Sequence, residues 1–378
     1  GDKSVSVTAA DLGISFSNLN VVDEAIDVGR SGNLIKRYKD KKDLQQGDKV
    51  IALSLDVDSD AVASILSEKA AQLNQEAVDN GLVRENGAFK IIKGEQGIEV
   101  NVEDSIAAIE NYISSEWDGG NAEIELVAEV VEPRGSEEDL EQITDMMGSY
   151  TTNYKDSGQN RCDNISNATS KINGTLLYPG EEFSVYEAIG PLDAANGYEL
   201  AGAYENGQTV ESYGGGVCQV STTLYNAVIL AELEITQRSN HSMIVSYVKP
   251  SMDAAIAGDY KDLRFVNNQD IPIYIEGYTE GKNVTFKIYG HDTRPSNRVV
   301  TYESEVVSEQ DPGTQYVATG DPAGYMKTAQ GKHIGYVARL WKVVTVDGVE
   351  ESREIFNKST YTVSYTHLRA HETRSNLV

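Results

Sequence analysis

The chain has few of the residues from which metal and nucleic-acid sites are built. Its 378 residues include only two cysteines and five histidines, with no Cys-x-x-Cys or His-rich pattern typical of zinc sites. The 32 basic residues are outnumbered by 59 acidic residues, and the net charge of −27 disfavours nucleic-acid binding because phosphates would be repelled. We therefore expect no metal, no other cofactor and no nucleic-acid partner.

Long apolar segments are also lacking. The sequence contains no signal peptide and no apolar run of 18 residues, and it begins at Gly1 instead of a methionine. Residues 12–26 and 96–106 resemble each other, since each is a short alternating strand that leads into an acidic helix start. The first copy lacks the elements that precede the second, so we expect a missing N-terminus in which a signal or membrane anchor would lie. The oligomeric state stays open.

The length exceeds what one ordinary hydrophobic core accommodates, and the residue pattern predicts an α+β multidomain protein. In order, we expect a truncated first repeat (1–43), an α+β second repeat (44–131), an acidic linker (132–150), an α+β domain with a helix over a small antiparallel sheet (151–292), an all-β module (296–363) and a tail (364–378). The tail carries two histidines and two arginines within eight residues and resembles translated sequencing-adapter read-through. We therefore interpret it as non-native.

The most informative stretch is residues 213–228, in which three consecutive glycines lead directly into a helical pattern. Apolar residues recur at every fourth position from Val220 to Val228, which predicts a helix over about 218–233. Cys218 therefore lies at a helix N-terminus, where free N–H groups and the helix dipole lower the pKa of a thiol and favour an oxyanion. The alternative is a small buried cysteine in a tight turn, and the local pattern alone leaves both open.

A nucleophilic Cys218 needs a base or an imidazolium within hydrogen-bond reach. Outside the tail the histidines are His241, His291 and His333. His241 comes just before a predicted strand over 244–248, and a helix that packs antiparallel to that strand would bring His241 close to the thiol. We therefore predict a Cys218–His241 pair, with a purely structural histidine as the alternative.

Several motifs in and around this stretch resemble the VanW family, and together they cover about residues 150–290. They are Gly-Gly-Gly-Val-Cys-Gln-Val-Ser-Thr-Thr-Leu-Tyr-Asn-Ala at 214–227, Asn-His-Ser at 240–242, Asp-Leu-Arg-Phe at 262–265 and Pro-Gly-Glu-Glu-Phe-Ser at 179–184. VanW domains occur in Gram-positive cell-envelope proteins and were named from a glycopeptide-resistance cluster. Some are regarded as cysteine-dependent L,D-transpeptidases. The resemblance implies that Cys218 is the nucleophile and a free thiol, although a disulfide with Cys162 stays open on sequence alone.

Two flanking regions resemble modules that accompany VanW domains. Residues 44–131 are similar to a peptidoglycan-binding domain, and residues 296–363, with a hairpin signal at Asp347-Gly348, are similar to a G5 domain. The resemblance implies binding to wall glycan or stem peptides, and the alternative for each region is an inert spacer. The expected location is extracytoplasmic, in the cell wall or at the cell surface through a membrane anchor.

A third group should orient the imidazole of His241. Its position along the chain allows Asp253, Asp262, Asn240 or Ser242, and the resemblance favours Asp262 because it belongs to the Asp-Leu-Arg-Phe motif. Several nearby residues have two interpretations. Arg264 would anchor a substrate carboxylate or pair with a surface acid, and Ser221 and Thr222 would contact the thiolate or cap the helix.

The resemblance implies acyl transfer on peptidoglycan. The Cys218 thiolate would attack an L,D-peptide carbonyl of a stem peptide, and amides around Gly215 and Gly216 would stabilise the oxyanion. His241 would protonate the leaving D-residue, and an amine of a neighbouring stem would take the acyl group from the thioester. Water as the acceptor would make the protein a carboxypeptidase. The alternative is a non-catalytic peptidoglycan-binding or adhesion module linked to glycopeptide resistance.

Overall fold

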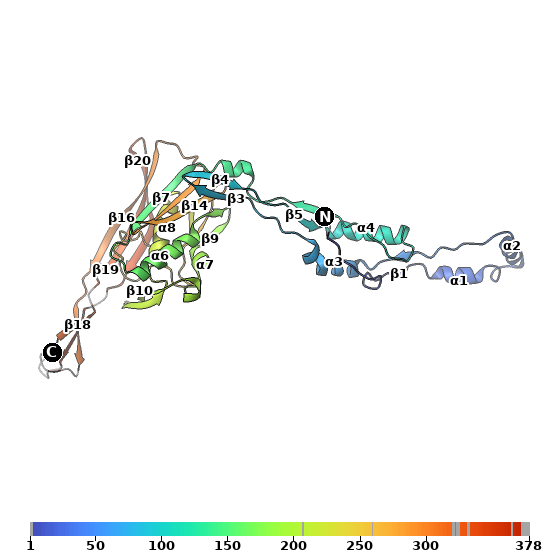
Figure 1. Ribbon diagram of the computed structural model, residues 1–378, viewed down its shortest axis with the longest axis horizontal. Coiled ribbons are helices and arrows are strands. Elements are labelled where there is room, and N and C mark those ends of the chain that lie inside the picture. The colour runs from blue at the N-terminus through green and yellow to red at the C-terminus, as the bar shows by residue number, and fades with distance from the viewer. Residues whose placement is uncertain are drawn as a thin grey trace. The chain divides into compact units, whose positions relative to one another are not determined.

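The computed structural model describes residues 3–205, 208–258, 260–319, 322, 326–330, 333–363 and 366–371. These residues form two compact units, whose elements Figure 1 labels. The first unit comprises Gly1–Asn80 and Lys93–Arg134, and the second comprises Gly81–Ile92 and Gly135–Val378. Both units contain helices together with small antiparallel sheets, which confirms the predicted α+β multidomain class. No helix within these described ranges is both long and apolar enough to cross a membrane.

The first unit is built around two helices that pack against each other, α3 (Ser59–Leu73) and α4 (Val102–Ser115). Their buried apolar side chains form a core with residues from the preceding segments, namely Leu12, Val57, Val62, Leu66, Ile109 and Ile113. The remaining elements are β1 (Ser15–Phe16) paired with β2 (Leu55–Asp56), β5 (Gly97–Val100) paired with β6 (Ala128–Val131), and the helices α1 (Asn20–Asp27) and α2 (Leu34–Leu44). The helices α1 and α2 bury none of their residues.

The second unit has a four-stranded antiparallel sheet with two helices against it. The strand order is β7 (Asp145–Asn153), β15 (Asn283–Gly290), β14 (Ile273–Glu280) and β8 (Thr175–Leu177). Helix α8 (Val217–Leu230) packs on β7 and β15, and α6 (Gln159–Ile172) packs on β14. The contact between α8 and the sheet is close at Gly148, where a Cβ atom would lie 2.2 Å from the Ala227 carbonyl oxygen. The predicted helix over a small antiparallel sheet is therefore confirmed.

Smaller elements surround this sheet. A second sheet has the order β12 (Glu234–Gln237), β13 (Arg264–Val266) and β9 (Glu182–Ser184), and a hairpin pairs β10 (Leu200–Glu205) with β11 (Gln208–Tyr213). Two short helices, α5 (Glu137–Glu141) and α7 (Val185–Ile189), and a 3-10 turn at Ala194–Asn196 connect the strands.

The hairpin of β3 (Gly81–Glu85) and β4 (Ala88–Ile92) belongs to the second unit, although we expected it within a continuous domain over 44–131. The reason is aromatic packing. The ring of Phe89 lies edge-on to Tyr274 and Tyr289, with ring centroids 5.3 Å and 5.2 Å apart. Leu82 of the hairpin is buried in the same cluster, while the other hairpin residues stay partly or fully exposed.

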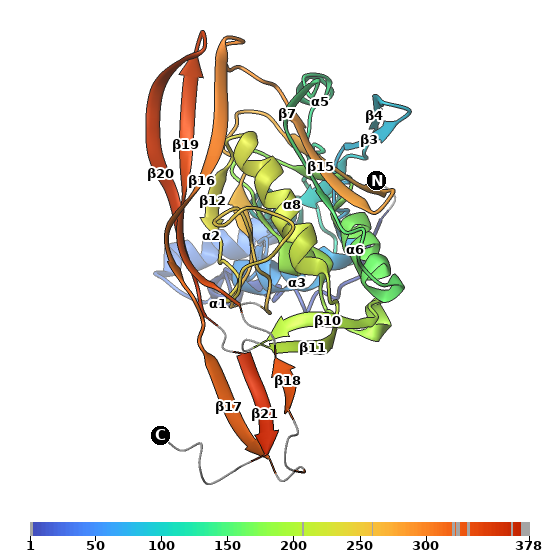
Figure 2. The same cartoon turned by 90° about the vertical axis from the view of Figure 1, so that its left-hand side faces the viewer.

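The C-terminal region is all-β, as the sequence predicts. The long strands β16 (Arg298–Gln310), β19 (Gly335–Val346) and β20 (Val349–Tyr361) form one antiparallel sheet in that order, beside α8 in Figure 2. The turn between β19 and β20 is the predicted one, with positive φ at Asp347 (52°) and Gly348 (77°).

The predicted tail is not separate from the fold. Its residues Thr366–His371 form β21, which pairs with β17 (Thr314–Thr319) and β18 (Met326–Gln330), and the three strands lie side by side in Figure 2. Residues 364–365 and 372–378 lie outside the described residues. That the tail is non-native stays a prediction.

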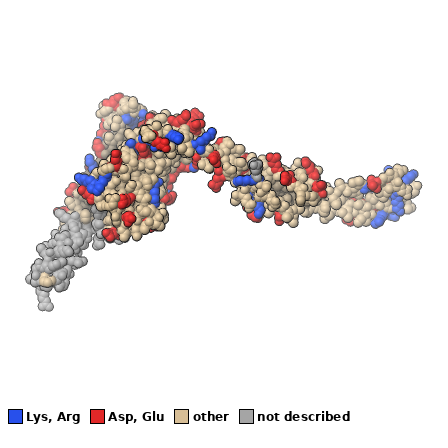
Figure 3. Space-filling view, in the orientation of Figure 1, with Lys and Arg blue, Asp and Glu red and all other residues tan. Residues whose placement is uncertain are grey.

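Charge is distributed unevenly over the first unit. Figure 3 shows acidic side chains spread over much of the surface, whereas lysine and arginine gather at the segment that contains α2. That helix has the sequence LIKRYKDKKDL, in which basic residues outnumber acidic ones. The net negative charge of the chain is therefore carried mainly outside α2.

Candidate active site

Cys218 lies in the first turn of α8, and the preceding glycines are required by close packing. A Cβ atom on Gly215 would lie 2.5 Å from the Ala201 carbonyl oxygen of β10. Gly216 has φ of 115°, and a Cβ atom there would lie 3.0 Å from Cγ of Arg161 on α6. The glycine run thus lets the start of α8 lie directly between β10 and α6.

An open cleft of about 1450 Å³ runs past this helix start. Its lining comes from 153–161, from the β10–β11 hairpin and glycine run, and from 241–261. Cys218 and His241 both line it. Cys218 as a whole residue is partly exposed. Neither cysteine forms a disulfide in the structure.

The structure brings Cys218 and His241 together. Burial by itself would raise the pKa of the thiol, but a hydrogen bond with His241, the charge of that imidazole and an Ile256 backbone hydrogen bond outweigh burial, so the pKa is lowered. Burial likewise would lower the pKa of His241, but hydrogen bonds with Asp253 and Cys218 raise it to about 9. Both shifts favour the thiolate–imidazolium pair over the neutral thiol and imidazole.

Asp253, not Asp262, orients the imidazole. Its Oδ2 lies 2.7 Å from Nδ1 of His241 and also accepts the backbone N–H of His241 at 2.7 Å. Because Nδ1 is engaged in this way, Nε2 is the nitrogen left for the thiol. Oδ1 of Asp253 accepts hydrogen bonds from Arg238 (3.1 Å) and from the Tyr361 hydroxyl of β20 (2.5 Å). The carboxylate is fully buried, and its hydrogen bond with His241 helps to keep its pKa low despite burial.

The preference for Asp262 was wrong because this carboxylate is occupied elsewhere. Oδ2 accepts the Ser184 hydroxyl at 2.5 Å, and Oδ1 accepts the backbone N–H groups of Tyr186 and Leu263 at 2.9 and 2.8 Å. Among its contacts in the described residues is also Nε of Arg264 at 3.1 Å, but not His241. Asp262 therefore ties β13 to the turn between β9 and α7.

Arg264 is likewise a structural residue. Besides Asp262, its guanidinium pairs with Glu182 at 3.2 Å and Glu187 at 2.6 Å. It does not line the cleft described above. The alternative of pairing with surface acids is therefore correct, and the predicted role in binding a substrate carboxylate is wrong.

Ser221 and Thr222 neither cap α8 nor contact the thiol. Both are fully buried, and both hydroxyls donate to the Ala254 carbonyl oxygen, at 2.5 and 3.2 Å. The Thr222 hydroxyl also accepts the Ala254 N–H at 3.0 Å, and Asn226 donates to the Met252 carbonyl oxygen at 2.8 Å. These side chains fix the segment that carries Asp253 next to α8.

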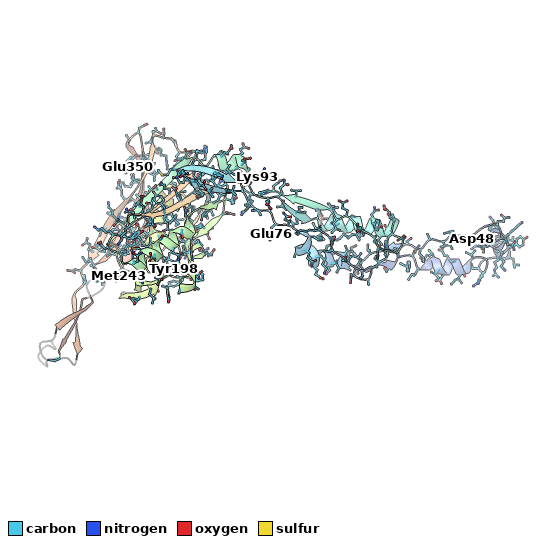
Figure 4. The ribbon with its side chains drawn as sticks, viewed as in Figure 1. Asp48, Glu76, Lys93, Tyr198, Met243 and Glu350 are labelled. Carbon is cyan, nitrogen blue, oxygen red and sulfur yellow. The ribbon has the colours of Figure 1, made fainter. Side chains whose placement is uncertain are left out.

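The strand predicted over 244–248 is absent, and residues 238–256 are irregular but packed. Met243, labelled in Figure 4, is 1% exposed. Side-chain hydrogen bonds hold this segment in place of strand pairing. Side chains of α8 bond to the backbone of 252–254, and the Tyr361 hydroxyl accepts the Ser251 N–H at 2.7 Å. His241 therefore reaches Cys218 through this irregular segment and not through a strand.

The backbone amides at the start of α8 differ in their availability. The N–H of Gly215 donates to Ser212 and that of Val217 donates to Gly214. The N–H groups of Gly216 and Cys218 have no backbone acceptor within the described chain. An oxyanion hole would thus use the N–H groups of Gly216 and Cys218. Gly215 matters for a different reason, namely that any side chain at this position would clash with β10.

Three residues around the pair have no signal in the sequence. Arg161 and Tyr247 line the cleft, and the charge of Arg161 contributes to the lowered pKa of Cys218. Tyr361 reaches Asp253 from the C-terminal sheet. None of these positions has a local motif, so only the fold brings them to the site. The described residues contain no group of three or more His, Cys, Asp or Glu side chains that could bind a metal.

Comparison with known proteins identifies the family. A model of the VanW like protein family matches residues 160–289. The chain is also 30% identical over 237 residues to "Uncharacterized protein YoaR" of Bacillus subtilis (strain 168), which covers 62% of this chain and 76% of that protein. The chain belongs to the VanW family. "Vancomycin B-type resistance protein VanW" of Enterococcus faecalis is 30% identical over 118 residues, covering 30% of this chain and 42% of that protein.

Regions outside the VanW domain also resemble known proteins. A family model described as "Putative peptidoglycan binding domain" matches residues 5–118, and so includes most of the region that we expected to be a truncated repeat. Its presence beside a VanW domain associates the protein with cell-wall peptidoglycan. Two G5 structures also match, the IgA1 protease G5 domain (22% identity, TM-score 0.17, 20% of this chain and 94% of that one) and another G5 domain (16%, 0.14, 19% and 93%).

Proposed function

We propose that this protein is a cysteine acyltransferase of the L,D-transpeptidase type that acts on peptidoglycan stem peptides. The observation that carries the proposal is the Cys218–His241–Asp253 arrangement in an open cleft. A lowered thiol pKa beside a raised imidazole pKa is the pattern of an activated cysteine nucleophile. The match to the peptidoglycan-binding family supports the choice of substrate, because that unit would keep the site near its polymer.

In the first half-reaction the Cys218 thiolate attacks the carbonyl carbon of the peptide bond between an L-residue and the terminal D-residue. Negative charge develops on the carbonyl oxygen and is stabilised by the N–H groups of Gly216 and Cys218. Nε2 of His241 then gives its proton to the leaving nitrogen, the C–N bond breaks, and a thioester remains. Asp253 keeps the ring oriented and stabilises its positive charge.

In the second half-reaction an amine of a neighbouring stem attacks the thioester carbonyl. His241, now neutral, takes the proton of that amine, the C–S bond breaks, and the thiolate–imidazolium pair is restored. Water at the same position would give a carboxypeptidase. The acceptor therefore decides whether the product is a cross-link or a shortened stem.

The proposal is tested by intact-mass measurement of the protein after incubation with a synthetic stem tetrapeptide. The expected result is an adduct with the mass of the tetrapeptide acyl group minus its terminal D-residue, in the wild type and in Cys162→Ala. Cys218→Ala should give no adduct. Addition of an amine acceptor, compared with buffer alone, separates cross-linking from hydrolysis. Folded wild-type protein that gives neither adduct nor product would contradict the proposal.

A further inference from the structure

Arg161 is a cation in the cleft that pairs with no carboxylate in the described part of the chain. It lies in the first turn of α6 and lines the same cleft as Cys218. Its Nη1 donates to the Ser157 hydroxyl at 2.6 Å and its Nη2 donates to Oε1 of Gln219 at 2.8 Å, and both acceptors are uncharged. Arg238, Arg264, Arg294 and Arg298, in the same unit, each pair with at least one carboxylate.

The position of this guanidinium is fixed by a buried amide. Gln219 is 1% exposed, and its Nε2 donates to the Thr152 hydroxyl and to the Asn153 carbonyl oxygen, both at 3.0 Å. With the NH₂ group used in this way, Oε1 must face Arg161. A guanidinium has five N–H groups, of which these contacts engage two, so enough remain for bidentate binding of a carboxylate.

The charges along the cleft favour an anionic ligand. Its charged lining residues are Lys155, Arg161 and Lys261, with Asp156 as the acidic residue among those described, and the charges of the Cys218 thiolate and the His241 imidazolium balance each other. This is the reverse of the whole chain, which has a net charge of −27. An excess of cations in a concave site attracts anions and raises their local concentration.

The position of Cys218 limits where the carboxylate of a bound substrate can lie, because the reacting carbonyl must be next to the thiol. The charge of Arg161 acts on the thiol, and Gln219 joins the two because it is the next residue after Cys218 and bonds to Arg161. In a peptide that ends one residue beyond the scissile bond, the terminal carboxylate carbon is at most about 4 Å from the scissile carbonyl carbon. A substrate whose carbonyl lies at the thiolate thus has its terminal carboxylate a few ångströms away, within the cleft that Arg161 also lines.

We propose that Arg161, held by Ser157 and Gln219, binds the terminal carboxylate of the leaving residue and so restricts cleavage to the last peptide bond of the stem. This inference rests on the function proposed above and adds its specificity. An internal peptide bond has no carboxylate at that place and would leave the guanidinium without its partner.

The test compares two tetrapeptides that differ only at the C-terminus, one with a free carboxylate and one with a carboxamide. Single-turnover acylation is measured for the wild type, Arg161→Gln, Arg161→Lys and Lys155→Gln. The wild type should acylate faster with the free acid, by roughly 10- to 100-fold, which corresponds to loss of a charge-assisted hydrogen bond. Arg161→Gln should remove this preference by slowing only the acid, and Arg161→Lys should keep part of it. Lys155→Gln, which removes a cleft charge that only adds to the general attraction for anions, should keep most of it.

Binding of both peptides is measured for Cys218→Ala and for the double variant that also carries Arg161→Gln. This measurement separates the inference from the proposed function. A wild type that acylates with acid and amide equally would overturn the inference and leave the function standing. Equal losses on both peptides in Arg161→Gln would also overturn it, since they would mark a structural role. Failure of acylation with either peptide would overturn the function, whereas an Arg161-dependent preference for binding the acid would still support the carboxylate site.

Discussion

The segments that carry Asp253 and Asp262 are only a few residues apart, and both carboxylates are fully buried, yet they serve different purposes. Asp253 faces the titratable ring of His241, the guanidinium of Arg238 and the hydroxyl of Tyr361. Asp262 faces backbone N–H groups, the hydroxyl of Ser184 and the guanidinium of Arg264, but no titratable ring. The comparison teaches that the partners of a buried carboxylate, and not its burial, show whether it takes part in chemistry.

The largest effect should come from Asp253→Asn. The amide cannot stabilise the imidazolium of His241 and favours the wrong tautomer, so the acylation rate should fall by about 10²- to 10⁴-fold. Single-turnover mass spectrometry measures this rate. Retained folding, checked by circular dichroism, is needed to assign the loss to the site. An Asp253→Asn protein that acylates at the wild-type rate would remove Asp253 from the account.

Asp262→Asn should act in the opposite way. It weakens the contacts that join β13 to β9 and α7, so the free energy of unfolding should fall by about 1–3 kcal/mol. At a temperature where the variant remains folded, its acylation rate should stay within about threefold of the wild type, as for a residue outside the reacting groups. Urea titration measures the first and the acylation assay the second. A large rate loss in fully folded protein would break the comparison.

A smaller effect on the acylation rate is expected from the C-terminal sheet, which reaches the site through Tyr361. Tyr361→Phe removes one hydrogen bond to Asp253, worth about 1 kcal/mol, so we expect an acylation rate lowered by roughly fivefold. Tyr302→Phe is the matched control, because its hydroxyl lies on β16 of the same sheet and donates to the Ile229 carbonyl oxygen. If both variants lose the same amount of activity, the sheet acts only through stability.

The pH dependence sharpens the same comparison. The nucleophilic thiolate is lost as pH falls through the lowered pKa of Cys218, and the proton for the leaving group is lost as pH rises through the pKa of His241 at about 9. The acylation rate should therefore be highest between these two pKa values and fall on both sides. Asp253→Asn should narrow the pH range over which acylation is fast, because it weakens the Cys218–His241 pair. Asp262→Asn should leave that pH range unchanged.

The local parts of the site could be predicted from sequence, and its long-range parts could not. The glycine run and the helix pattern place Cys218 at a helix start because both signals lie within a few residues. His241 was predicted to lie beside it, but by way of a strand over 244–248 that does not form. That segment is positioned by Ser221, Thr222 and Asn226, whose hydrogen bonds to the backbone have no periodic pattern.

The choice between Asp253 and Asp262 failed for a related reason. A family motif marks residues that the fold requires as well as residues that react, and Asp-Leu-Arg-Phe belongs to the first kind. The fold class could be predicted because alternating apolar residues define β14 and β15, and the turn between β19 and β20 has its own sequence signature. The roles of Arg161 and Tyr361 depend on contacts between distant segments, which no single stretch of sequence shows.

The central claim is that Cys218 and His241 form an activated pair, and one measurement tests it most directly. The rate of iodoacetamide alkylation is followed against pH in Cys162→Ala, with and without His241→Ala. The account predicts a rate plateau with an apparent pKa well below the ordinary thiol value of about 8.5, and loss of that plateau without His241. An ordinary thiol titration that is indifferent to His241, or protection of Cys218 until the protein unfolds, would contradict it.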